Sequence, residues 1–591
     1  MKASAHFNPL APALLALAAL AMPFAAAAGE ELKQKPALRR PLALDICDGW
    51  LLCANRDSGS VSMIDLDLLE VSSEKKIGQR LGDLESTGSG ILVTDSTAGC
   101  LLALAFNDGK LEPAAVVPIS GSPQDIAMSL SGKQCAVASP WSRQVTLVAL
   151  EKGTEGQTLP RKTAEARLPF APGLQAFCRD DTLLVVADAF GGQLALVDPR
   201  NGKLLGTRLI EAHGIRGLAA SRDGKSLHLS HQRIESAAPT TRNRVFWGQV
   251  ISNILRGISV DHLLEDDGKR SGGAKLVAHW SLYPFGSPSK AAGDPGAVTV
   301  GTLGTTMVAL GGVDRIGLRP KPGHVFEEIE VGDRPVAIAL GPLERYGYVA
   351  NFFDDSISVV DTAAAEVVRT ISLGPERKLS SAEKGEKLFY DAKLSLDGWY
   401  SCHSCHPDGH THGQLNDNLG DDTYGTPKRV PTLLGTSNTG PWGWIGNRTT
   451  LWEQVEKSIE TTMRGGKPEP PTVEALVAYL ELFDTSPPGN AAVDSSAVAR
   501  GRQVFERLKC SKCHRPPTYT NVGTYDVGLQ DETGQGFYNP PSLKGLQHRS
   551  SFLHDNRAAT LSGALELHQP VSIRSLRRTD HADLLSFLLS L

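Results

Sequence analysis

One pattern decides the fold of this chain, and it is clearest in the stretch YVANFFDDSISVVDT, residues 348–362. A short apolar run is followed by a polar turn and by a second run, rich in β-branched residues, that ends at an acid. Such runs favour extended strands, and a short polar turn between two of them favours a hairpin. The stretch therefore predicts two neighbouring strands of one sheet.

The same pattern recurs from about residue 40 to residue 375. Seven units are visible, and they open at Leu52–Asn55, Leu92–Asp95, Ala136–Ser139, Val185–Asp188, Leu227–Ser230, Val308–Gly311 and Tyr348–Asn351. Most units are spaced as four-stranded propeller blades would be. A wider gap after residue 230 holds an aromatic insertion with Phe246, Trp247, Trp280, Tyr283 and Phe285. We therefore expect an all-β, seven-bladed propeller over residues 37–375, with this insertion on one face.

Residues 348–362 also closely resemble the YVTN family of β-propeller repeats, and the repeated region covers more than half of the chain. The resemblance implies blade geometry and a binding platform. It names no ligand, because propellers serve many unrelated functions.

A helical region is expected after Gly374-Pro375. Residues 380–383, Ser-Ser-Ala-Glu, have the spacing of a capping box before a helix at residues 384–390. A second internal duplication follows, in which residues 385–389 match 501–505, 430–433 match 540–543, 447–448 match 556–557, and 473–482 match 581–591. The duplication predicts a mostly α-helical, two-lobed region with a first lobe at residues 376–490 and a second at 491–591.

Each predicted lobe carries one C-x-x-C-H motif, Cys402-His403-Ser404-Cys405-His406 and Cys510-Ser511-Lys512-Cys513-His514. At this spacing two thiols attach covalently to haem c and the adjacent histidine reaches the iron. A zinc site or a redox dithiol is the alternative, but two copies in matched lobes favour haem. We expect Cys402, Cys405, Cys510 and Cys513 to bind two haems, with His406 and His514 as proximal iron ligands.

The residue opposite each proximal histidine decides whether the iron is closed by a second ligand or open to a substrate. The second lobe contains no methionine, so His568 is the best candidate there and His554 is the runner-up. For the first haem the candidates are Met463, His410 and His412. Met463 could equally be a core residue, and the two histidines could be loop residues.

The region from Ser380 to Leu591 resembles the bacterial di-haem cytochrome c peroxidase and MauG family. The resemblance implies a peroxide-reactive haem in the first lobe and an electron-transferring haem in the second. In that family a methionine or tyrosine occupies the position of His568, so a histidine pair would be expected to lower the reduction potential of that haem.

The resemblance also implies roles for residues around the first haem. Gln454 matches a distal glutamine, Glu460 lies two residues from the position of a distal acid, and Trp444 matches an aromatic residue between the haems. Arg448 belongs to the same expected pocket. A calcium site would fall near Arg429 and Asn539, where Arg429 replaces a neutral ligand.

Composition and the N-terminus limit the partners and the location. The 591 residues exceed a single core, and a net charge of -5 without a basic stripe excludes nucleic acid as an expected partner. An apolar run ending at Ala26-x-Ala28 predicts a signal peptide at residues 1–28, and no other stretch is long enough to span a membrane. We therefore expect a periplasmic or secreted protein.

The remaining five cysteines are expected to be buried side chains without a function. They are Cys47, Cys53, Cys100, Cys135 and Cys178.

Three functional hypotheses follow. The first is a peroxidase-type oxidoreductase that uses hydrogen peroxide and electrons from a redox protein partner, with the propeller helping to dock that partner. The second is a non-catalytic electron carrier with a propeller docking platform. The third places a catalytic metal in the propeller, at His213, His228, His231 or His279.

Overall fold

The computed structural model describes residues 38–591 except 108, 155, 266–280, 488–493, 569–572 and 574–575. The expected signal peptide at residues 1–28 lies outside the described residues, as do His279 and Trp280. Within the described part of the chain, no helix is long and apolar enough to cross a membrane.

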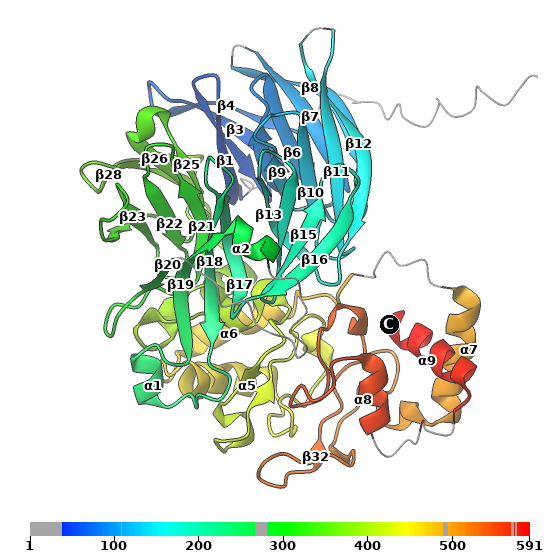
Figure 1. Ribbon diagram of the computed structural model, residues 1–591. Helices are drawn as coiled ribbons and strands as arrows, with labels where there is room; N and C mark the ends of the chain where they lie inside the picture. Colours follow the sequence, from blue (N-terminus) through cyan, green and yellow to red (C-terminus); the bar gives the residue numbers. More distant parts are fainter. Residues whose placement is uncertain are drawn as a thin grey trace, which may run out of the picture. The chain divides into compact units, whose positions relative to one another are not determined.

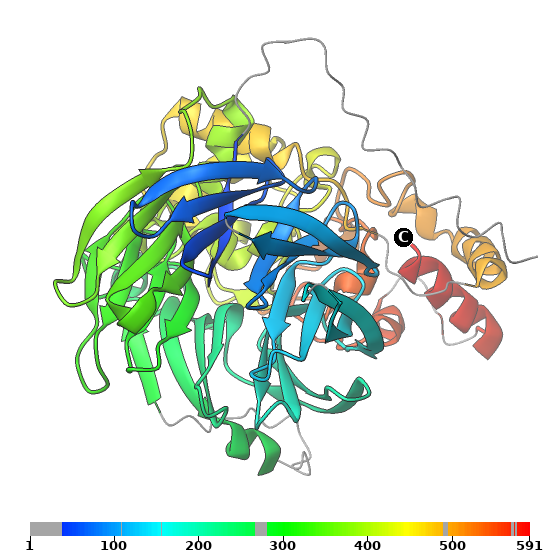
Figure 2. The same ribbon diagram turned by 90° about the horizontal axis from the view of Figure 1, so that it is seen from above.

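The first part of the chain forms a seven-bladed β-propeller in which each blade is a four-stranded antiparallel sheet of consecutive strands. Figure 2 shows the sheets arranged around a common centre. Blades one to four comprise β1 (Pro41–Cys47), β2 (Trp50–Asn55), β3 (Ser60–Asp65), β4 (Glu70–Lys76), β5 (Leu81–Ser86), β6 (Gly90–Asp95), β7 (Cys100–Asn107), β8 (Lys110–Pro118), β9 (Asp125–Met128), β10 (Gln134–Ser139), β11 (Gln144–Lys152), β12 (Thr158–Arg167), β13 (Pro172–Cys178), β14 (Leu183–Asp188), β15 (Gln193–Asp198) and β16 (Lys203–Leu209). Blades five to seven comprise β17 (His213–Ala220), β18 (Ser226–Ile234), β19 (Ile251–Ser259), β20 (Ser281–Phe285), β21 (Pro295–Val300), β22 (Thr306–Leu310), β23 (Arg315–Arg319), β24 (Glu327–Glu330), β25 (Pro335–Leu340), β26 (Tyr346–Asn351), β27 (Ser356–Asp361) and β28 (Glu366–Ser372).

The seven apolar runs of the sequence all fall on the second strand of a blade, which confirms the propeller and the number of its blades. The middle strands β2 and β3 are buried along almost their whole length, whereas the outer strand β4 is exposed at most positions. A strand covered on both faces requires continuous apolar residues. The apolar pattern of the sequence therefore identifies the middle strands of the blades, but not the outer strands.

A polar contact explains the Asn and Ser positions of the opening stretch. In β26 and β27, Asn351 lies opposite Ser356, and its Nδ2 donates to the hydroxyls of Ser356 at 3.0 Å and Ser358 at 2.9 Å. The first blade repeats the arrangement, where Asn55 donates to Ser60 at 3.1 Å and Ser62 at 2.9 Å. Each amide thus fixes a buried hairpin that apolar packing alone would leave free to slip.

The ring closes between the first and the seventh blade, where β1 contacts β25. The backbone amides of Arg39 and Arg40 donate to the Asp355 carboxylate at 3.0 and 2.7 Å. The side chain of Arg40 is fully buried and reaches Glu386 at 3.3 Å, and Arg56 of the first blade reaches the same carboxylate at 2.8 Å. The closure of the ring is therefore joined to the helical region that follows it.

Helices dominate the C-terminal region, which we divide into a first segment (376–490) and a second segment (491–591). Blade five carries the short helices α1 (Arg242–Phe246) and α2 (Val260–Glu265). The first segment holds α3 (Ser381–Phe389), α4 (Cys402–Cys405), β29 (Leu415–Asn416), β30 (Lys428–Arg429), α5 (Leu451–Lys457) with a π-helical turn at Ser458–Thr462, and α6 (Pro470–Leu480). The second segment holds α7 (Ser495–Arg507), a 3-10 turn at Cys510–Lys512, β31 (Tyr525–Asp526), β32 (Phe537–Tyr538), α8 (Leu561–Leu567) and α9 (Arg578–Leu589).

Paired glycines show how the two segments correspond. In the first segment α3 packs on α6, and a Cβ at Gly385 would lie 1.9 Å from the Ala475 carbonyl oxygen. In the second segment α7 packs on α9, as Figure 1 shows, and a Cβ at Gly501 would lie 2.0 Å from the Asp583 carbonyl oxygen. Only glycine allows such a close approach of two helices. The capping box at Ser380 also forms as expected, with Glu383 at its third position.

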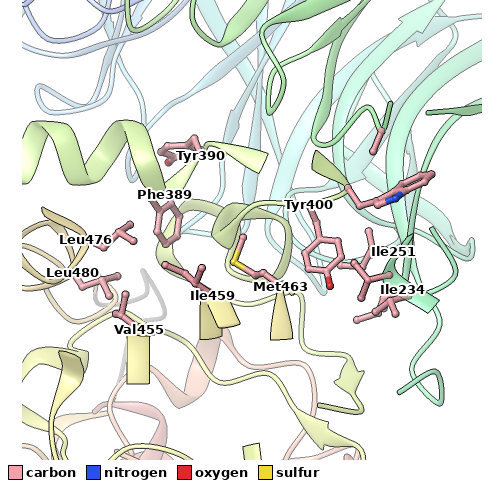
Figure 3. Close-up of a cluster of buried hydrophobic side chains, with 14 of the residues drawn as sticks. Ile234, Ile251, Phe389, Tyr390, Tyr400, Val455, Ile459, Met463, Leu476 and Leu480 are labelled. Carbon is pink, nitrogen blue, oxygen red and sulfur yellow. The ribbon is translucent and has the colours of Figure 1, made fainter. Parts of the chain in front are cut away.

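The two segments differ in how their cores are built. Buried residues of the first segment share one hydrophobic cluster with propeller residues, and Figure 3 shows Ile234 and Ile251 of the propeller with Phe389, Tyr400 and Met463. The second segment has a cluster of its own around Phe505, Phe587 and Leu588. The first segment is therefore packed as a continuation of the propeller core.

Candidate functional site

The first C-x-x-C-H motif opens into a cavity of about 290 Å³, which we call cavity 1. Cys402, Cys405 and His406 line it, and α4 supplies both cysteines. Burial lowers the pKa of His406 to about 4, so its imidazole is neutral at pH 7. Its Nδ1 is buried and has no hydrogen-bond partner among the described residues. A neutral imidazole is the form that ligates a metal.

The second motif opens into a cavity of about 360 Å³, which we call cavity 2. Cys510, Cys513 and His514 line it. The Nδ1 of His514 lies 3.1 Å from the Tyr519 carbonyl oxygen, and burial lowers the pKa of His514 to about 4. A hydrogen bond at Nδ1 fixes the ring and leaves Nε2 to serve as a ligand.

A second histidine faces His514 in cavity 2. His568 follows the last residue of α8 and lines the cavity, and its ring centre lies 6.3 Å from that of His514. Two imidazoles that bind one ion from opposite sides, each about 2 Å from it, place their ring centres about 6 Å apart. The runner-up His554 also lines this cavity, but its Nε2 lies 3.2 Å from the Tyr538 hydroxyl. The ring separation of His514 and His568 is thus compatible with a ligand pair, whereas His554 contacts Tyr538.

Cavity 1 has a different residue at the matching position. His568 lies eight residues after Thr560, the N-cap of α8, and Ser458 lies eight residues after Thr450, the N-cap of α5. The hydroxyl of Ser458 lines cavity 1 and accepts a hydrogen bond from Gln454 Nε2 at 3.1 Å. A histidine pair like that of cavity 2 therefore has no counterpart at this position.

Some of the other candidate ligands line cavity 1, and others do not. Gln454 and Met463 line the cavity, and Met463 is also part of the shared core. His410 and His412 are buried loop residues and are not among the residues that line cavity 1. His410 Nδ1 lies 3.0 Å from the Thr432 hydroxyl.

Two residues expected in the first pocket lie outside its wall. Arg448 pairs with Asp422 at 3.0 Å and also donates to the Asn447 carbonyl. Glu460 belongs to the π-helical turn and is not among the lining residues. A π turn inserts one residue per turn, so side chains beyond it rotate away from the positions of an α-helix.

Trp444 lies between the two cavities and lines both. Its Nε1 donates to the Arg429 carbonyl oxygen at 2.7 Å, and its ring centre lies 6.3 Å from that of His554. Arg429 and Asn539, where calcium was expected, also line both cavities. The guanidinium of Arg429 lies 5.3 Å from the centre of the Trp444 ring, so a cationic side chain already occupies this place.

Lys457 is a functional candidate that the sequence analysis missed. It lines cavity 1, is 8% exposed, and its Nζ lies 3.4 Å from Asn418 Oδ1. Burial lowers its pKa to about 8. Its spacing of three residues from Gln454 in the expected helix is a signal that could have found it.

Propeller residues hold the loop that carries the first cysteine pair. The Asp294 carboxylate accepts hydrogen bonds from the hydroxyls of Ser401 and Ser404, which directly precede Cys402 and Cys405. Arg216 of β17 pairs with Asp408 at 3.0 Å, two residues after His406. The propeller therefore fixes the first motif from outside the segment that contains it.

The propeller histidines do not form a metal site within the described residues. The described chain contains no group of three or more His, Cys, Asp or Glu side chains that could hold a metal ion. His213 lies against His412, with ring centres 4.6 Å apart, and His231 Nε2 accepts a hydrogen bond from Arg256 at 3.0 Å. The five scattered cysteines are buried, as expected.

The residues of both cavities fit haem. Each cavity offers two thiols beside a neutral buried imidazole, and its volume is near the lower end of typical cofactor pockets, about 300–1,000 Å³. Burial raises the pKa of the Cys402 and Cys405 thiols to about 12. A reactive dithiol requires a lowered pKa, so the structure disfavours the redox-dithiol alternative at this motif.

A propeller joined to a region with two haem-type cavities defines a class of modular redox protein. Residues 380–508 match the family model described as di-haem cytochrome c peroxidase. The C-terminal region of this chain is therefore similar to the di-haem cytochrome c peroxidase and MauG family, whose members are oxidoreductases with haem cofactors.

Curated relatives agree with this assignment at modest identity. The methylamine utilization protein MauG of Methylophilus methylotrophus is 23% identical over 276 residues, which is 36% of this chain and 82% of the relative. Cytochrome c551 peroxidase of Nitrosomonas europaea is 23% identical over 284 residues, which is 39% of this chain and 85% of the relative. Among solved structures, hydrazine synthase of Kuenenia stuttgartiensis matches at a TM-score of 0.46 and 15% identity, over 57% of this chain and 99% of that one.

Proposed function

We propose that this protein is an exported, two-lobed di-haem peroxidase that reduces hydrogen peroxide with electrons from a redox protein partner. The contrast between the two cavities carries the proposal. Cavity 2 places His568 opposite His514 at 6.3 Å, whereas cavity 1 has Ser458 at the matching position. A site with two strong ligands favours electron transfer, and a site without the second ligand can admit a substrate.

Four cysteines would attach the two haems covalently, and His406 and His514 would be the proximal ligands. A haem in cavity 1 would pass two electrons from the redox partner to one hydrogen peroxide, which with two protons gives two waters. The residues of the protein itself would bind the peroxide and deliver the protons.

Gln454 and Lys457 are the residues that we assign to peroxide in cavity 1. The Gln454 amide is held by Ser458 and can donate a hydrogen bond to a peroxide oxygen. Lys457 lines the same wall and remains protonated below pH 8, so its Nζ can supply a proton, the role that the sequence had assigned to Glu460.

Trp444 is the group that we place on the electron path. It is the aromatic side chain that lines both cavities among the described residues, and its indole N–H is fixed by the Arg429 carbonyl. The partner would deliver electrons at cavity 2, and the propeller would help to dock that partner.

A second candidate function is electron transfer without catalysis, and Met463 favours it. The Met463 side chain lines cavity 1 and is 4% exposed. A thioether there could close the first iron, and both sites would then only carry electrons.

Electron paramagnetic resonance of the oxidised and half-reduced protein, before and after one equivalent of hydrogen peroxide, separates these functions. We expect one low-spin and one high-spin ferric signal, with the high-spin signal lost on peroxide addition. In His568→Ala the low-spin signal should also become high-spin, while His581→Ala serves as a control in the same segment. Low-spin ferric signals alone, two in the oxidised form and one in the half-reduced form, both unchanged by peroxide, would reject the peroxidase and support the carrier.

Two cheaper measurements test the remaining parts. N-terminal sequencing of the protein from the periplasmic fraction should begin near residue 29, and a start at residue 1 would contradict export with cleavage. Reduced monohaem cytochrome c, used as a probe donor, should be oxidised by peroxide only in the presence of the protein.

A further inference from the structure

Two arginines lie in the wall between the cavities. Arg429 and Arg549 each line both cavity 1 and cavity 2. Arg429 ends β30, and Arg549 follows a 3-10 turn of the second segment. They come from different segments, and both belong to the wall that the two cavities share.

The two guanidinium groups are buried and have no anionic partner in the part of the chain that the structure describes. Arg429 is 4% exposed, and its Nε donates to the Leu553 carbonyl oxygen at 3.1 Å. Arg549 donates from Nη2 to the carbonyl oxygens of Ser542 at 2.6 Å and Lys544 at 3.3 Å, and its Nε is buried without a partner. Among the described residues, no carboxylate lies within ion-pair distance of either guanidinium.

Burial and mutual repulsion both act against these charges. Burial lowers the pKa of Arg429 to about 9, with a further contribution from Arg549, and burial lowers the pKa of Arg549 to about 10. Removing a charge from water without a partner costs several kcal/mol. Carbonyl bonds and the contact with the Trp444 ring compensate only part of this cost. Such a pair is therefore expected where a bound ligand supplies negative charge.

The ligand that fits is a carboxylate held at the edge of both cavities. Arginine binds carboxylates through two parallel N–H groups, and haem carries two propionate carboxylates. A divalent cation between the cavities would lie beside the Arg429 guanidinium and would be repelled by it.

We propose that Arg429, assisted by Arg549, is a carboxylate-binding residue shared by both haems, which pairs with a propionate of each and replaces a bridging metal ion. The inference rests on the proposed function, because it requires a haem in each cavity. Arg429 would thereby couple the two sites electrostatically, since one cation stabilises the reduced form of both irons.

The test uses spectroelectrochemical titration of the full-length, haem-loaded protein. We expect Arg429→Gln to lower the midpoint potentials of both haems and Arg429→Lys to leave both near the wild-type values. Arg500→Gln is the matched control, because this arginine lies on α7 and pairs with Asp583 at the surface. Metal analysis should find two irons and no stoichiometric calcium, and a chelator should leave both potentials unchanged.

Several results would overturn the proposal. A fall of one potential alone, an unchanged pair of potentials in Arg429→Gln, an equal fall in Arg429→Lys, or stoichiometric calcium with chelator-sensitive potentials would each do so. If Arg429→Gln does not load two haems, Arg549→Gln takes its place and must lower both potentials. A wild-type protein with fewer than two haems would instead reject the proposed function.

Discussion

The first and second segments of the C-terminal region are built on corresponding helices but differ where those helices face the cavities. Gly385 and Gly501 allow the same close helix packing in both. The helix beside cavity 2 ends at His568, whereas the helix beside cavity 1 continues through Ser458 into a π-helical turn. A duplicated scaffold can thus keep its packing while one position differs between the two cavities, with His568 at one and Ser458 at the other.

The segments also differ in what surrounds them. Core residues of the first segment pack with residues of the propeller, whereas the second segment has its own cluster. Cavity 1 is therefore expected to depend on the propeller for its stability, and cavity 2 is not.

The largest expected effect is the loss of one haem. Cys402→Ala/Cys405→Ala and Cys510→Ala/Cys513→Ala should each reduce the pyridine-haemochrome count from two haems to one, because each pair supplies both thioether bonds of one site. Cys47→Ala, a buried propeller cysteine, should retain both haems. A double variant that still carries two covalent haems would contradict the prediction that each segment binds one haem through its own cysteine pair.

Core truncations test whether the cores are shared or separate. Phe389→Ala and Phe505→Ala each remove a ring that is 1% exposed, and each should cost about 3–5 kcal/mol. In differential scanning calorimetry, Phe389→Ala should lower the transition of the propeller together with that of the first segment. Phe505→Ala should lower only the transition of the second segment, and equal effects on one common transition would contradict the comparison.

Lys457 provides a pH-dependent difference between the segments, since Leu567 occupies the matching position of α8. Because burial lowers the pKa of Lys457 from 10.5 to about 8, the unfolded chain binds more protons between these values, and wild-type stability should rise with pH there. Lys457→Met should therefore be more stable at pH 7 by on the order of 3 kcal/mol.

The Lys457→Met advantage should shrink as the pH approaches 10.5. Denaturant unfolding at pH 7 and pH 10 measures it, with Lys467→Met as an exposed control. A difference that does not change with pH would show that the Lys457 charge is not buried.

The smallest effect concerns the contact between the propeller and the first motif. Arg216 and Asp408 are 27% and 46% exposed in their side chains, so their ion pair should contribute only about 0.2–1 kcal/mol. Arg216→Ala should lower the free energy of unfolding by that amount, and high salt should erase the difference. A loss above about 2 kcal/mol would mean that this pair is part of the shared core.

Patterns within short stretches of the sequence predicted strands and helices of this protein, but not the contacts between these strands and helices. The middle strands of the blades, the Ser380 capping box and Gly385 with Gly501 were readable because each follows from a period or a spacing within the sequence. The shared core was not readable, since Ile251 and Phe389 meet only after the propeller has formed.

Site residues show the same division. The two motifs were recognised by their spacing and His568 by the lack of a methionine in the second lobe, and the cysteines and proximal histidines of both motifs and His568 line the cavities. Glu460 was proposed from the family resemblance, two residues from the position of a distal acid, but it lies in the π-helical turn and does not line cavity 1. Lys457 was overlooked because a lysine in a helix is usually solvated, and only tertiary packing buries this one.

The closure of the ring has a consequence for the order of events during biogenesis. The first blade is synthesised early, but its Arg40 needs Asp355 of the seventh blade and Glu386 of α3, more than 300 residues later. Such distant contacts form slowly and leave strand edges exposed in the meantime. The first C-x-x-C-H motif follows Glu386 by only a short stretch, so the ring can close only when the chain is available nearly as far as this motif.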